Sequence, residues 1–280
     1  MENTEAFRNQ LDPKSEIGMV RLGVKDLAKM SLFYQDVIGL SVIDQGKGHT
    51  DLGVSGLPLV GLVSKPEGVS SPYSTGLYHL AILLPDRFEL GRWLLNFLEN
   101  GYRLDGAGDH LVSEALYLSD PDGNGIEMYR DRPREDWEIN NGQIKMDTLP
   151  VDIQSMLQEA PKDGFNGLPV GTKMGHVHLQ VNDVSSVSAF YQQILGFDLV
   201  AQLPGAGFLS VGGYHHHIGM NTWRSYGGGA APKNALGLID YQVRLPNKDA
   251  LNPLVNRLSQ HKVAYEQHNG NIRLQDPAGI

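Results

Sequence analysis

The chain has 280 residues, of which 41% are hydrophobic, so it can bury a substantial core in one or two domains. Its formal net charge of −9 makes nucleic acids and anionic membrane surfaces poor partners, because no basic field is present to hold their phosphates. We expect no membrane contact, since no apolar run approaches the roughly 18 residues of a membrane-spanning helix. The polar segment 1–16 also lacks the apolar core of a signal peptide.

Cysteine is absent, which excludes disulfides, thiolate metal sites and cysteine nucleophiles. We therefore expect a cytoplasmic protein. Any metal would have to be held by His, Asp or Glu side chains, which suit iron, manganese, nickel or zinc. The ten histidines provide enough candidates.

Two segments nearly superpose at a constant offset of 157 residues, as the difference 175 − 18 shows. GMVRLGV at 18–24 matches GHVHLQV at 175–181, and FYQDVIGL at 33–40 matches FYQQILGF at 190–197. A gapless match of this length indicates an internal duplication.

Each copy predicts a strand, a helix and three short strands. The opening strand shows alternating polarity, and Asp26 and Asp183 then stand where a helix N-cap belongs. Gly39 and Gly196 fall where a left-handed residue would end each helix. The short strands are expected at 42–44, 50–52 and 57–63 in the first copy, and at 199–202, 207–211 and 214–223 in the second.

A second related pair is interleaved with the first. GLYHLAILLP at 76–85 resembles GLIDYQVRLP at 237–246. Each segment precedes an apolar helix, expected at 88–98 and 251–258, and each copy later reaches an Asp-Pro turn, DPDG at 120–123 and DPAG at 276–279. The last copy stops just after its turn, so we expect its final strand to be missing from this chain.

The chain thus divides into four βαβββ units, at about 17–64, 74–130, 173–224 and 235–280. We expect units 1 and 2 in a first domain at 17–130, a linker at 131–172 with one short helix at 151–160, and units 3 and 4 in a second domain at 173–280. One unit alone exposes a half-curved sheet, so units must pair. The predicted fold is α+β, with two half-barrels that each enclose a cavity.

Over its whole length the chain resembles the vicinal oxygen chelate superfamily, which includes glyoxalase I, bleomycin resistance proteins and extradiol dioxygenases. The resemblance rests on HVHL at 176–179 with the following Phe190, Tyr191 and Gly196, and on LYLSDPDGNGIE at 116–127. It implies that metal ligands come from the first and last strands of a unit, where both strands face the cavity.

Mapped onto this chain, those positions hold His79 and Glu127 in unit 2 and His176 in unit 3, but only Met19 in unit 1 and Asp240 in unit 4. We therefore expect unit 2 to pair with unit 3, because that pairing gathers every good ligand in one cavity. Two histidines and one carboxylate leave three metal positions open, as suits Fe(II) that binds a substrate together with O₂. Mn(II) is the alternative metal.

Three further residues match catalytic positions of extradiol dioxygenases. Their acid/base histidine lies in a His-His pair before small or apolar residues, and HHIG at 216–219 matches it with His217 in that role. Tyr117 stands ten residues before Glu127 and would hydrogen-bond the substrate. His110 precedes Tyr117 and would steady the substrate or O₂.

Two more histidines are assigned to substrate binding. His178 follows His176 on the same face of its strand, and His215 shares a face with His217 if 214–223 is a strand. On that reading His216 points outward.

The leading functional hypothesis is an extradiol dioxygenase that cleaves a catechol-like aromatic diol with O₂ and Fe(II). A glyoxalase-type isomerase or lyase is the first alternative; it would take His217 as a fourth ligand and needs cations for a thiol cofactor, for which Arg130, Arg132 and Arg134 follow Glu127. A metal-free small-molecule resistance protein is the second. The sequence leaves the aromatic substrate and a homo-oligomeric state open.

Overall fold

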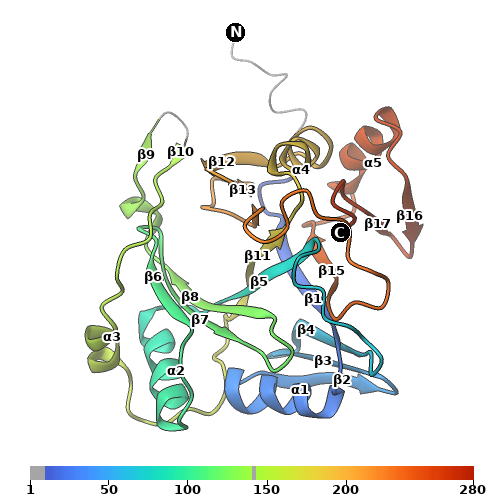
Figure 1. The fold of residues 1–280 in the computed structure, drawn as a ribbon. Helices are drawn as coiled ribbons and strands as arrows, with labels where there is room; N and C mark the ends of the chain where they lie inside the picture. Colours follow the sequence, from blue (N-terminus) through green and yellow to red (C-terminus); the bar gives the residue numbers. More distant parts are fainter. Residues whose placement is uncertain (1–9, 141–142) are drawn as a thin grey trace.

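The computed structural model describes residues 10–140 and 143–280. Within these residues every unit opens with a strand that leads into a helix (Figure 1). Unit 1 holds β1 (Glu16–Val24), α1 (Leu27–Phe33), the π-helical turn Tyr34–Ile38, β2 (Ser41–Gly46), β3 (His49–Val54) and β4 (Leu57–Ser64). Unit 2 holds β5 (Gly76–Leu83), α2 (Arg87–Glu99), β6 (Gly106–Asp109), β7 (Ser113–Ser119) and β8 (Gly125–Asp131).

The second half of the chain repeats this order. The linker carries the 3₁₀ turn Arg134–Asp136, β9 (Ile139–Asn140), β10 (Gln143–Ile144) and α3 (Ile153–Glu159). Unit 3 holds β11 (Lys173–Gln180), α4 (Val184–Phe190), the π-helical turn Tyr191–Leu195, β12 (Asp198–Leu203), β13 (Ala206–Ser210) and β14 (Ile218–Asn221). Unit 4 holds β15 (Gly237–Arg244), α5 (Leu251–Gln260), β16 (Tyr265–His268) and β17 (Asn271–Leu274).

The strands form two large sheets that join units far apart in sequence. One has eight strands in the order β12-β13-β14-β11-β5-β8-β7-β6, and the other has five in the order β15-β1-β4-β3-β2. Antiparallel pairing of β5 with β11 joins units 2 and 3, and antiparallel pairing of β1 with β15 joins units 1 and 4. The predicted α+β fold and the predicted pairing of the units are both confirmed.

The duplicated helices begin and end as the repeat predicts. Asp26 and Asp183 cap them by accepting backbone N–H groups of the first turn. Each helix passes into a π-helical turn and stops at a glycine with left-handed backbone, Gly39 at φ 92° and Gly196 at φ 89°.

A tyrosine from each of these helices fastens its unit to the next one. The hydroxyl of Tyr34 donates to Asp120 in the turn of unit 2 at 3.2 Å, and that of Tyr191 donates to Asp276 in the turn of unit 4 at 3.0 Å. Both tyrosines are buried. The Asp-Pro turns are therefore structural anchors between successive units.

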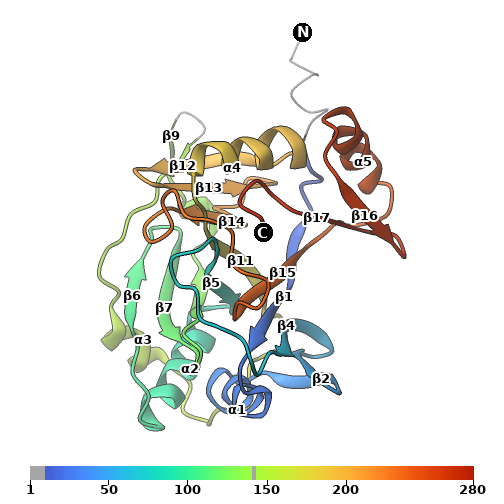
Figure 2. The same ribbon diagram turned by 45° about the vertical axis from the view of Figure 1, so that its right-hand side comes forward.

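Two predicted strands differ from the structure. The strand expected at 214–223 begins only at Ile218, because residues 211–217 form an irregular loop with left-handed Gly212 and Gly213, at φ 61° and 68°. Unit 4 contributes only β15 to the five-stranded sheet, since β16 and β17 pair with each other in a separate hairpin beside α5 (Figure 2).

The linker covers the outer side of unit 2. Its helix α3 lies within the expected span 151–160 and packs on α2, where a Cβ on Gly91 would lie 2.7 Å from the Met156 carbonyl oxygen. Figure 1 shows both helices outside the sheet formed by β6, β7 and β8. Among the described residues, no helix combines the length and apolarity needed to cross a membrane.

Candidate metal centre

Three neighbouring strands at the centre of the eight-stranded sheet bring His79, Glu127 and His176 together. Glu127 Oε2 lies 3.0 Å from His79 Nε2 and 3.2 Å from His176 Nε2, and the two Nε2 atoms are 3.4 Å apart. Three donor atoms bound at right angles about 2.1 Å from one ion lie about 3.0 Å from each other. The spacing of the three buried side chains therefore fits a single metal ion.

Strand register explains this convergence. Ala81 lies opposite Glu127 in the parallel pair of β5 and β8, and His79 lies opposite His178 in the antiparallel pair of β5 and β11. A register shift in β11 between Met174 and His176 adjusts the second histidine. Gly175 lies inside that shift, where a Cβ would meet the Tyr129 hydroxyl oxygen at 1.7 Å.

The electrostatics of these three side chains favour the protonation states that bind metals. Burial lowers the pKa of His176 to about 4, so its imidazole is neutral at pH 7. Burial alone would raise the pKa of Glu127, but His176 and His79 outweigh it and hold that pKa well below the usual range. A carboxylate beside a neutral imidazole is the form in which both ligands coordinate a cation.

Aromatic rings surround this group. The ring centroid of Tyr117 lies 5.8 Å from that of His79, and Tyr78 lies 5.5 Å from His79 on another side. Trp223 meets Tyr78 edge-on at 5.2 Å. The rings that enclose the three side chains, which we call the aromatic cage, are Tyr78, Tyr117, His178, Phe208, His216 and Trp223.

His178 belongs to this cage, close to the place where the sequence predicts it. Its ring lies 4.9 Å from that of His79, and its buried Nε2 has no hydrogen-bond partner within the described residues. Burial lowers the pKa of His178 well below 6.5, so the ring is neutral. Gly219 gives it room, since a Cβ there would lie 2.7 Å from Nδ1 of His178. The predicted contact of His178 with substrate remains a prediction.

Tyr117 and His110 form the hydrogen-bonded pair that bounds the cage on the side of the linker. His110 Nδ1 lies 2.8 Å from the Asp147 carbonyl oxygen, so this nitrogen must carry the proton and donate it. His110 Nε2 is then an acceptor, and the Tyr117 hydroxyl donates to it at 2.7 Å. The linker thus fixes the orientation of two residues that the sequence predicts to lie in the site.

The expected orientation of His216 is wrong. Its side chain points inward with 8% exposure, and its ring lies 4.0 Å from that of His176. Alternation along a strand does not apply here, because 211–217 is a loop. Sequence reasoning had therefore missed His216, although HHIG contains it.

The other two residues of this histidine run lie elsewhere. His215 is fully buried and has both ring nitrogens engaged, Nε2 by Asp131 and Nδ1 by His216, each at 2.8 Å, which leaves none for the expected substrate contact. His217 Nδ1 accepts from the Val211 backbone N–H at 3.3 Å. Its ring lines a separate cavity of about 320 Å³ with Lys14, Arg134 and Lys173. Burial lowers the pKa of His217 to about 3.

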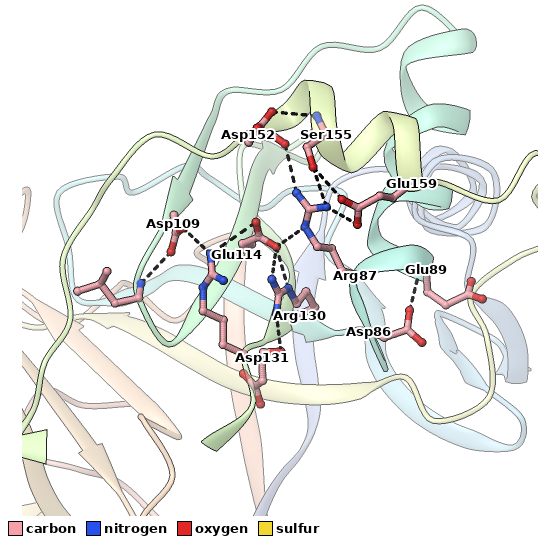
Figure 3. Close-up of polar contacts among 12 residues, drawn as sticks. Asp86, Arg87, Glu89, Asp109, Glu114, Arg130, Asp131, Asp152, Ser155 and Glu159 are labelled. Carbon is pink, nitrogen blue, oxygen red and sulfur yellow. Dashed lines mark hydrogen bonds and ion pairs between the residues drawn. The ribbon is translucent and has the colours of Figure 1, made fainter. Parts of the chain in front are cut away.

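The three arginines after Glu127 are committed to contacts away from the cage. Arg130 Nε donates to Glu114 at 2.8 Å, and Arg132 Nη2 donates to Asp109 at 2.5 Å. Figure 3 shows Arg130 inside an ion-pair network with Glu114, Arg87 and Glu159 of α3. Arg132 adds a contact to Glu114 at 3.7 Å. Arg134 donates to the Gly212 carbonyl oxygen at 3.1 Å.

The five-stranded sheet holds an ion pair at the equivalent place. Arg21 lies opposite Asp240, as His178 lies opposite His79 in the other sheet, and the two side chains form a bidentate pair. The Met19 side chain occupies the position that corresponds to His176. Asp240 and Met19 thus stand at the positions of the candidate ligands His79 and His176, and Asp240 is paired with Arg21.

Comparison with known proteins places these features in context. The model of the glyoxalase/bleomycin resistance protein/dioxygenase superfamily matches residues 16–128 and 173–279. The chain is 44% identical over 269 residues to a catechol-2,3-dioxygenase of Bacillus subtilis (strain 168), and the match covers 94% of each protein.

The fold of this chain is similar to that of several solved structures. A putative dioxygenase from Bacillus subtilis subsp. subtilis str. 168 superposes with a TM-score of 0.66 at 13% identity, over 95% of this chain and 83% of that one. A glyoxalase I mutant from Zea mays superposes with a TM-score of 0.56 at 15% identity, over 95% and 90% of the two chains. At these identities the comparison concerns the arrangement of the strands and helices alone.

Proposed function

The chain belongs to the glyoxalase/bleomycin resistance protein/dioxygenase superfamily, and from that premise we propose that it is an extradiol ring-cleaving dioxygenase. It would open a catechol-like aromatic ring beside its two hydroxyls, with O₂ as co-substrate and one Fe(II) per chain. The observation that carries the proposal is the convergence of His79, His176 and Glu127 inside the aromatic cage. The name of the 44% identical relative supports the same reaction class.

The donor set suits this chemistry. When bound, Fe(II) would supply a Lewis-acidic, redox-active centre with open positions for the diol and O₂. Glu127 contributes one negative charge and the histidines none, so a catechol monoanion would make the buried assembly neutral, at low desolvation cost. Mn(II) accepts the same ligands and is the alternative metal.

Residues of the cage would handle the protons of the substrate. We assign the acid/base role to His216 instead of His217, because the His216 ring contacts His176 while His217 lines another cavity. Burial lowers the pKa of His216 well below 6.5, so it is neutral at pH 7 and available as a base. The Tyr117 hydroxyl donates its hydrogen bond to His110, so its oxygen can accept a hydrogen bond from a substrate hydroxyl. His178 Nε2 offers a further polar contact.

The residues that the sequence assigns to the glyoxalase-type alternative are engaged elsewhere. A fourth ligand from His217 is not at hand, since its ring packs on Tyr214 with centroids 4.9 Å apart and lines the other cavity. Arg130 and Arg132, two of the three arginines that would hold the carboxylates of a thiol cofactor, are already paired with Glu114 and Asp109, and Arg134 lines the other cavity. These contacts favour ring cleavage as the function of the site.

The test is to load the protein with Fe(II) without oxygen and then add catechol and ¹⁸O₂. We expect O₂ uptake in a 1:1 ratio to catechol and a yellow ring-opened product that contains both labelled atoms. The Zn(II)-loaded protein and the His79→Ala variant should be inactive. Turnover that does not need O₂, or O₂ uptake that leaves the ring closed, would refute the proposal.

A further inference from the structure

Behind the cage, three side chains form a continuous hydrogen-bonded chain. Asp131 Oδ1 lies 2.8 Å from His215 Nε2, and His215 Nδ1 lies 2.8 Å from His216 Nδ1. His215 has no exposed surface and His216 has 8%. These hydrogen bonds lead from the end of β8, through the loop before β14, to the His216 ring that contacts His176.

The direction of these hydrogen bonds follows from the acceptor at the far end. A carboxylate has no proton to give, so His215 Nε2 must donate to Asp131. A neutral His215 then has a lone pair at Nδ1, and the short contact between the two Nδ1 atoms requires His216 to carry its proton there. His216 Nε2 is left with a lone pair, and it has no partner in the part of the chain that the structure describes.

We propose that Asp131 and His215 are positioning residues that hold His216 in its Nδ1–H tautomer, so that Nε2 is free to take a proton from the substrate. This proposal rests on the proposed function only for the identity of the substrate that gives its proton to His216 Nε2. It also gives a role to His215, which lies outside the aromatic cage.

The surroundings keep this chain in place. The His215 ring lies between Tyr214, with centroids 4.1 Å apart, and Trp137, at 5.4 Å. The Tyr214 hydroxyl donates to the same oxygen of Asp131 at 3.1 Å. The Asp131 side chain keeps 26% exposure.

This exposure opens onto the 320 Å³ cavity that Lys14, Arg134 and Lys173 also line. The hydrogen-bond directions given above for Asp131, His215 and His216 are those with an Asp131 carboxylate as the acceptor.

The tautomer can be read directly by ¹⁵N NMR of the histidine side chains in the metal-free full-length protein at pH 7.5. We expect His216 to show a protonated Nδ1 and an unprotonated Nε2, and His215 to show the reverse. A His216 protonated at Nε2, or a His215 protonated at both nitrogens, would overturn the inference.

A matched set of variants tests the cause. Asp131→Leu removes the acceptor but keeps a side chain branched at Cγ, and we expect both rings to populate two tautomers. Asp131→Asn keeps an acceptor oxygen and should restore the single tautomer at least in part. Tyr214→Phe removes the other donor to Asp131 and should keep the wild-type tautomers. Equal effects of all three variants would mean that Asp131 acts only on packing.

Activity provides an independent second measurement. With Fe(II) and catechol, Asp131→Leu should lower kcat about tenfold to a hundredfold and change KM less than about threefold, because proton transfer is affected more than binding. Loss of metal binding in this variant would contradict a positioning role. If the wild-type protein shows the expected tautomers but does not cleave catechol, the proposed function fails while the hydrogen-bond direction stands; the opposite result refutes this inference alone.

Discussion

His79 and His176 place their Nε2 atoms 3.4 Å apart although they come from different units, one on β5 and one on β11. Antiparallel pairing of these two strands creates the contact, and Glu127 on the adjacent β8 completes it. The three candidate ligands therefore meet only because units 2 and 3 share one sheet.

Removal of one member of this group should abolish metal binding. We expect His79→Ala and Glu127→Gln to weaken Fe(II) or Zn(II) binding at least about a hundredfold, because the first removes a donor atom and the second removes the only negative charge of the three side chains. Competition with a chromophoric chelator measures the affinity. His178→Ala is the matched control and should keep the affinity within about threefold; a larger loss would make His178 a ligand.

The number of metal ions tests the other half of the molecule. Arg21 and Asp240 fill the equivalent place in the five-stranded sheet, and a guanidinium there repels a divalent cation. We expect one metal ion per chain by elemental analysis after reconstitution, and none in His79→Ala. A second ion that survives in His79→Ala would show that the ion pair opens to bind metal.

The wall of the aromatic cage near solvent should govern substrate affinity. Trp223 is 56% exposed and meets both Tyr78 and His178, so it lies at the edge of the cage. Trp223→Ala should raise KM for catechol about fivefold and leave kcat nearly unchanged, because an aromatic contact contributes about 1 kcal/mol. Trp223→Phe is the control and should recover most of the affinity. A fall in kcat at constant KM would instead place Trp223 in the chemical step.

Much of the fold could be predicted because duplication leaves local signals twice. The helix caps at Asp26 and Asp183 and the left-handed stops at Gly39 and Gly196 depend on neighbouring residues only, so the sequence is sufficient to locate them. The pairing of units 2 and 3 could be deduced because one cavity had to collect His79, Glu127 and His176.

The histidine run 215–217 shows what a sequence pattern cannot supply. Strand alternation predicts the wrong orientation for His216, because Gly212 and Gly213 adopt left-handed backbone and turn the chain before β14 begins. Whether such a loop or a strand forms depends on contacts with Asp131 and Tyr214, which come from distant strands or from the loop itself. The ion-pair network around Glu114 likewise involves residues that no short motif connects.

Acidification should destabilise the metal-free protein through its buried histidines. The pKa of His176 is about 6.5 in the unfolded chain and about 4 in the folded one. Above pH 6.5 the His176 imidazole is neutral in both the folded and the unfolded state, so its ionisation does not lower the free energy of unfolding. As the pH falls towards 4 the unfolded chain takes up a proton that the folded chain refuses, which costs about 1.4 kcal/mol per pH unit and about 3 kcal/mol in all.

Burial also lowers the pKa values of His178 and His216, so these two residues should make the free energy of unfolding fall more steeply with decreasing pH. Urea unfolding of metal-free protein between pH 8 and pH 4.5 measures the effect. His176→Gln should reduce by about one the number of protons taken up on unfolding, so the free energy of unfolding should depend less steeply on pH. A midpoint that does not move between pH 7 and pH 5 would contradict burial of neutral imidazoles.

The network in Figure 3 should matter for stability and not for metal binding. Glu114 is 4% exposed and accepts from Arg87 at 2.9 Å and from buried Arg130 at 2.8 Å, on the side of the sheet covered by α2 and α3. Glu114→Gln removes the negative charge that pairs with both guanidiniums, and Arg130 then has no carboxylate partner among the described residues, whereas Arg87 keeps Glu159. The loss should lower the free energy of unfolding by about 3 kcal/mol.

Glu138 offers the matched control for this substitution, because its ion pair with Lys145 at 2.7 Å is exposed to solvent. Glu138→Gln should leave the urea midpoint unchanged, since exposed ion pairs contribute little. Folded Glu114→Gln should bind metal with wild-type affinity, as the network lies on the far side of the sheet from Glu127. Equal midpoints for the two variants would mean that solvent screens the Glu114 network, and weakened metal binding in Glu114→Gln would mean that the network also fixes the position of β8.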